Sequence, residues 1–133
     1  MQEKPSIQFF IKKIAVLASL VLMFSFAFQA KSVMAHAALI KSDPPRRATL
    51  SISPKQVRLW FNEKIEGSYA AVTVFDSNKN SMTENNPESV ADDPKSVILS
   101  LPQLGSGRYT VKYRVRSVDG HVIESSFDFN VKE

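Results

Sequence analysis

The sequence contains no cysteine among its 133 residues. This absence excludes disulfide bonds, zinc fingers, cysteine nucleophiles and thiolate metal sites. Histidine is scarce as well, since His36 and His121 are the only two. The chain must therefore hold its fold by burial and strand pairing, and a metal site would have to use very few nitrogen donors.

The N-terminal segment has the pattern of a secretory signal peptide. Three lysines precede an apolar run at residues 14–28, which is shorter than the roughly 20 residues of a transmembrane helix. Small residues permit cleavage after Ala35, and an A-x-A pattern also permits it after Ala37. An uncleaved membrane anchor is the third alternative. We expect residues 1–35 to be removed and the domain 36–133 to be periplasmic.

Removal of this leader changes the charge balance of the protein. The whole chain carries 17 basic and 13 acidic residues, a net charge of +4, and the leader holds four of the basic and one of the acidic residues. The remaining 98 residues therefore have a net charge of +1 and suffice for one domain. So small a net charge does not indicate binding to nucleic acid or to an anionic membrane surface.

Beyond residue 36 the pattern is that of short strands separated by turns, and no long helical period is present. The polar stretch 76–94 is typical of a long loop or an irregular hairpin. About seven strands in so short a domain indicate an all-β Greek-key β-sandwich or barrel, immunoglobulin-like and cupredoxin-like. The expected strands are 38–40, 49–52, 57–61, 69–75, 96–101, 108–116 and 122–131.

Alternation along three of these strands predicts which side chains face the core. The inward-facing residues are expected to be Val57, Leu59, Phe61, Tyr109, Val111, Tyr113, Val115, Phe127, Phe129 and Val131.

The run 117–121 (SVDGH) lies between the last two expected strands. Gly120 can adopt the left-handed conformation of a tight turn, which would direct Asp119 and His121 outward. An ordinary exposed hairpin turn explains the same residues.

The second histidine shifts this interpretation toward a metal site. A cut after Ala35 makes His36 the first residue, whose α-amine and ring Nδ1 can chelate one metal ion. A second imidazole and a carboxylate, from His121 and Asp119, would complete a square set of nitrogen and oxygen donors. Cu(II) prefers this geometry. A cut after Ala37 would delete His36.

Taken together, these segments resemble the CopC-type periplasmic copper-binding proteins. The resemblance spans essentially the whole mature domain, and the combination of its pieces is specific. The segments that carry it are 36–45 (HAALIKSDPP), 59–63 (LWFNE), 117–121 (SVDGH) and 127–129 (FDF).

The resemblance implies a Greek-key fold that binds Cu(II) through His36, Asp119 and His121. Glu63 matches a glutamate that contributes in some members, although a surface charge at a strand end explains it equally well. Other members have a Cu(I) site of clustered methionines, whereas the mature domain here has only Met82, which we interpret as a loop residue. Soft thioethers suit Cu(I), so a variant that binds one Cu(II) per mature chain is implied.

We therefore expect a monomeric periplasmic Cu(II) carrier or sequestering protein that is not an enzyme and not membrane-embedded. It would act in copper tolerance or in delivery to an inner-membrane copper transporter. The alternatives are a copper-dependent oxidative enzyme with a histidine-brace site and a metal-free immunoglobulin-like interaction module. Zinc at the same residues is a further alternative. A hydrolytic triad is disfavoured, because its residue types crowd into 117–121 and no G-x-S-x-G elbow exists.

Overall fold

The computed structural model describes residues 7–27 and 37–132. The chain divides into two compact units. In the first unit, α1 (Ile7–Ala27) is a helix of 21 residues that begins upstream of the apolar run and includes Lys12 and Lys13. Within the described ranges, no helix combines the length and the apolar character needed to cross a membrane.

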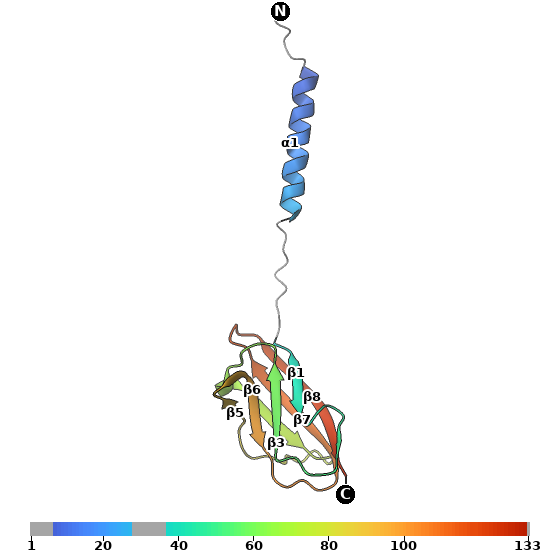
Figure 1. Ribbon diagram of the computed structural model, residues 1–133, viewed down its shortest axis with the longest axis vertical. Helices are drawn as coiled ribbons and strands as arrows, with labels where there is room; N and C mark the ends of the chain where they lie inside the picture. The colour runs from blue at the N-terminus through green and yellow to red at the C-terminus, as the bar shows by residue number, and fades with distance from the viewer. Residues whose placement is uncertain (1–6, 28–36, 133) are drawn as a thin grey trace, which may run out of the picture. The chain divides into compact units, whose positions relative to one another are not determined.

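The second unit is a β-sandwich (Figure 1). One sheet has the strand order β1-β3-β6-β5 and the other β2-β8-β7-β4. All neighbouring strands pair antiparallel except β2 and β8, which are parallel. The strands are β1 (Leu39–Asp43), β2 (Thr49–Leu50), β3 (Gln56–Phe61), β4 (Ala71–Phe75), β5 (Glu88–Val90), β6 (Asp93–Ser100), β7 (Gly107–Arg116) and β8 (Val122–Val131), and the 3-10 turn η1 (Gly67–Tyr69) precedes β4.

The prediction of an all-β Greek-key sandwich is confirmed, and the structure decides two details that the sequence left open. The two sheets stay separate and do not close into a barrel. The described residues form eight strands, where about seven were expected. The additional strand β5 lies inside the stretch 76–94, and its antiparallel pairing with β6 agrees with the irregular hairpin that was one of the two interpretations of this stretch. Three polar or half-exposed residues cannot display a period, and β5 pairs with β6 through a register shift between Ser89 and Val90.

The core lies between the two sheets and consists of alternate side chains from both. Every residue predicted to face inward is buried, and Val57, Leu59 and Phe61 of β3 are 0% exposed. The ring of Phe61 meets Tyr113 edge to face across the core, with their centroids 5.9 Å apart. The buried set also includes Ala37, the first described residue of this unit, at 2% exposure.

The hairpin of β7 and β8 determines where the turn 117–121 lies. The two strands pair without interruption from Gly107 opposite Val131 to Arg116 opposite Val122. Because the ladder is long and its inner face is buried, its register cannot slip without exposing the core. The turn is therefore presented from a rigid end of the sandwich.

Candidate metal centre

The turn between β7 and β8 is closed by two backbone hydrogen bonds. The Gly120 N–H donates to the Ser117 carbonyl at 2.8 Å, and the Ser117 N–H donates to the His121 carbonyl at 2.9 Å. Gly120 has a φ of 94°, as its place in a tight turn predicts. The residues on either side of Gly120 are thereby brought to the same side of the hairpin end.

Asp119 and His121 form a side-chain pair on this turn. His121 Nδ1 lies 3.0 Å from Asp119 Oδ2, and the two side chains are 33% and 49% exposed respectively. A carboxylate on one ring nitrogen holds the imidazole in one orientation and one tautomer. The pair therefore presents an imidazole and a carboxylate side by side on the turn.

Ser117 contacts the other oxygen of the same carboxylate. Its side chain is 0% exposed, and its hydroxyl donates to Asp119 Oδ1. This hydrogen bond is the main reason that the pKa of Asp119 lies below its usual value, with the contacts to His121 adding to the effect and partial desolvation opposing it. Asp119 therefore stays an anionic oxygen donor in mildly acidic solution.

The segment after β3 connects the start of β1 to this turn. The Ala38 N–H donates to Asn62 Oδ1 at 2.6 Å, and the Asn62 N–H donates back to the Ala38 carbonyl at 3.1 Å. Two residues further on, the Lys64 carbonyl accepts the Val118 N–H at 3.2 Å. The backbone that follows residue 36 and the turn with Asp119 are thus both hydrogen-bonded to residues 62–64.

The predicted ligands are brought together only in part. Asp119 and His121 are adjacent, and Glu63 is half-buried between Asn62 and Lys64. Within residues 7–27 and 37–132, no three His, Asp or Glu side chains gather closely enough to hold a metal ion, so Glu63 does not join the Asp119–His121 pair there. His36 and the bond that precedes it lie outside the described residues.

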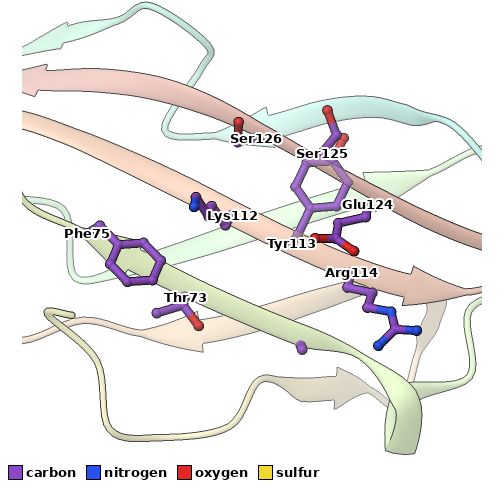
Figure 2. A pocket seen from close by; sticks show the side chains of 9 residues that line it. Thr73, Phe75, Lys112, Tyr113, Arg114, Glu124, Ser125 and Ser126 are labelled. Atoms are coloured by element: carbon purple, nitrogen blue, oxygen red, sulfur yellow. The ribbon is translucent and has the colours of Figure 1, made fainter. Parts of the chain in front are cut away.

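Two hollows on the surface lie away from this turn. One, of about 510 Å³, is lined by residues that include Met82 and Ser100. Met82 lies in a loop, as expected, and also packs against the core. The other lies on the outer face of β4, β7 and β8 (Figure 2). There the Lys112 ammonium lies 5.3 Å from the centroid of the Phe75 ring, and the alternation of charged and hydroxyl side chains is that of a solvated sheet face.

Ser117 was expected as part of the run 117–121 and as a member of the disfavoured hydrolytic triad, but its contact with the Asp119 carboxylate was not predicted. The contact joins residues two apart, at the point where the strand ends and the turn begins. The contact could have been predicted from the serine two positions before an aspartate at the end of a strand, since short hydroxyl side chains hydrogen-bond locally in turns.

Comparisons with known proteins agree with this architecture. A sequence profile of the CopC domain matches residues 39–132. Copper resistance protein C of Escherichia coli is 32% identical over 108 residues, which cover 76% of this chain and 85% of that protein. The crystal structure of CopC from Methylosinus trichosporium OB3b gives a TM-score of 0.70 at 33% identity, over 73% of this chain and 94% of that one.

A further relative is much longer than this chain. Copper transport protein CutJ of Bacillus subtilis (strain 168) is 26% identical over 113 residues, which are 84% of this chain. The matched part spans only 21% of the length of CutJ, so the similarity concerns one domain of that protein.

Proposed function

Because the chain belongs to the CopC domain family, we propose that it is an exported copper-binding protein acting in copper tolerance, sequestration or delivery. The observation that carries the proposal is the Asp119–His121 pair on a rigid turn, with Ser117 behind it. An imidazole nitrogen and an anionic oxygen suit Cu(II). The proposed role is non-enzymatic.

The proposed complex is one Cu(II) ion per mature chain. Its donors are the α-amine and Nδ1 of His36, a ring nitrogen of His121 and an oxygen of Asp119. The hydrogen bonds of Ala38 with Asn62 and of Val118 with Lys64 support this set, because both segments are held by one short stretch of chain. Two residues of extended backbone reach about 7 Å, which lets residue 36 approach the turn.

Glu63 is proposed as an additional contributor. Its neighbours Asn62 and Lys64 make these same hydrogen bonds, and its side chain is half-buried.

We further propose that residues 1–35 are a secretory leader and that cleavage follows Ala35, so that the protein acts in the periplasm. Burial of Ala37 supports this cut over the one after Ala37, since the later cut would remove a core residue as well as His36. An inner-membrane copper transporter is the proposed recipient, and a monomer is the proposed active state.

The decisive experiment is a Cu(II) titration of protein that begins at His36, with intact mass spectrometry to identify the first residue and the metal stoichiometry. One tightly bound Cu(II) per chain is expected, with weaker binding as the pH falls, because amine and imidazole must lose protons to bind metal. The matched control begins at Ala35 and should bind far more weakly. Equal affinity of the two forms would overturn the N-terminal chelate.

Metal selectivity is tested on the same protein by competition with Zn(II). Cu(II) should displace Zn(II), following the general affinity order of divalent metals at nitrogen and oxygen sites. Preferential retention of Zn(II) would contradict a copper role.

A further inference from the structure

Ser117 is a buried polar residue beside a mostly apolar core. Among the described residues, the buried polar side chains are Ser42, Ser96 and Ser117, and Ser117 is 0% exposed. A buried hydroxyl destabilises a fold unless it is hydrogen-bonded. Its single proton is directed to Asp119 Oδ1, with the His121 carbonyl a longer 3.4 Å away. The hydroxyl is therefore committed to the carboxylate of the proposed site.

Hydrogen bonds at both the N–H and the carbonyl of Ser117 hold its backbone in place. Its N–H donates to the His121 carbonyl at 2.9 Å, and its own carbonyl accepts the Gly120 N–H at 2.8 Å. Ser117 also forms an isolated bridge with Ile65, which extends the sheet contacts beyond the end of β7. The backbone position from which the Ser117 hydroxyl reaches Asp119 is thus held independently of the Asp119 side chain.

Asp119 would otherwise have considerable rotational freedom. Its side chain is 49% exposed on a turn, where a carboxylate ordinarily samples several rotamers. Here Oδ1 accepts from Ser117 and faces the His121 N–H at 3.4 Å, while Oδ2 lies 3.0 Å from His121 Nδ1. Each carboxylate oxygen of Asp119 therefore has a neighbouring polar group, and the His121 ring lies against the same carboxylate.

From these contacts we infer that Ser117 is a positioning residue for the metal centre. Its hydroxyl holds the Asp119 carboxylate in the orientation that aligns the His121 ring before the ion arrives. The inference rests on the proposed copper site and adds a residue that does not touch the metal. Partners of this kind change metal affinity by about 10- to 100-fold when they are removed.

The first test compares Ser117→Ala with Ser96→Ala. Both variants remove a buried serine hydroxyl, and that of Ser96 bonds to Arg58 and to the Asp93 carbonyl on the other sheet. Ser117→Ala should weaken Cu(II) binding by about 10- to 100-fold and alter the copper hyperfine splitting in the electron paramagnetic resonance spectrum. Ser96→Ala should leave both unchanged. Equal behaviour of the two variants would overturn the inference.

A double-mutant cycle separates this inference from the proposed ligand set. If Ser117 acts through Asp119, adding Ser117→Ala to Asp119→Ala should cost no further affinity. Additive losses would show that Ser117 acts independently of Asp119, which overturns the positioning role alone. Unchanged affinity of Asp119→Ala would overturn the ligand set and the positioning role together.

The metal-free wild-type protein supplies a test that needs no substitution. Two-bond proton–nitrogen NMR at fixed neutral pH reports which ring nitrogen of His121 carries the proton. We expect Nδ1 to carry it, since this atom lies 3.0 Å from Asp119 Oδ2, and a population with the proton on Nε2 should appear in Ser117→Ala. A wild-type ring protonated mainly on Nε2 would overturn the inference even if the variant failed to fold.

Discussion

Two turns of the sandwich are each built around an aspartate whose pKa lies below its usual value. One turn follows β4 and contains Asp76; the other joins β7 and β8 and contains Asp119. Asp76 Oδ1 accepts the backbone N–H groups of Asn78 and Asn80 at 2.9 and 2.8 Å, and the Asn80 amide donates to Oδ2 at 3.1 Å. All of these donors belong to the turn itself.

The groups around Asp119 differ chemically from those around Asp76, although both sets lower the pKa of their aspartate. Its main donor is the Ser117 hydroxyl, and an imidazole pairs with its other oxygen. Amide donors can only complete a turn, whereas an imidazole can also bind a metal ion. A lowered carboxyl pKa therefore does not identify a functional aspartate in this protein, and the identity of the groups around it does.

The largest loss of stability is expected from a substitution in the core, which supports both turns. Phe61→Ala should lower the free energy of unfolding by about 3–5 kcal/mol, because Phe61 is 0% exposed and packs against Tyr113. Urea unfolding measures the loss. Val118→Ala, at a side chain that is 63% exposed, is the control and should change stability little. A comparable loss in both would contradict the assignment of the core.

Removing the imidazole should break the metal site and leave the scaffold intact. His121→Ala is expected to weaken Cu(II) binding by more than about 100-fold, above the loss typical of residues that only support a ligand. The melting temperature of the metal-free protein should change little, because the side chain is 33% exposed. Competition titration measures the affinity. Retained affinity would remove His121 from the proposed donors.

The two aspartates provide a matched pair of substitutions. Asp119→Asn should reduce Cu(II) affinity with little loss of stability, since an amide is a poor ligand for Cu(II). Asp76→Asn should lower the melting temperature, because an amide offers one oxygen to the three donors of that turn, and should leave copper binding unchanged. Calorimetry and copper titration of both variants test the contrast. The reverse pattern would exchange the roles assigned to the two turns.

The smallest effect concerns a third aspartate that belongs to neither turn. Hydrogen bonds from Thr110 and Arg108 hold the pKa of Asp128, on β8, below the usual 3.8. A carboxyl with a lowered folded-state pKa stabilises the fold above the unfolded-state pKa, and this stability is lost as the pH falls through the folded-state pKa. Asp128→Asn should therefore flatten the decline of stability below pH 3.8.

Acid unfolding of the two proteins, followed by circular dichroism, measures this difference. The decline should be reduced and not abolished, because Asp76, Asp93 and Asp119 also have lowered pKa values. An identical acid profile for wild type and Asp128→Asn would show that the hydrogen bonds of Asp128 contribute no pH-dependent stability.

Part of the site was predictable because it is local. The residues 117–121 lie within one turn, so the left-handed glycine and the proximity of Asp119 to His121 follow from short-range geometry. The connection of this turn to residues 62–64 was not predictable in the same way, since the Val118–Lys64 hydrogen bond joins positions far apart in the chain. The place of Glu63 beside this connection depends on that pairing.

The faces of the strands were already determined by the order of the amino acids. Alternation of apolar and polar residues is a local property, and burial of one face is the dominant favourable term in folding; every predicted inward residue of β3, β7 and β8 is accordingly buried. Pairing between distant segments was settled by tertiary structure. The short strand β5 pairs with the edge of β6, and Ser117 is buried where it forms a bridge with Ile65, a residue far from it in the chain.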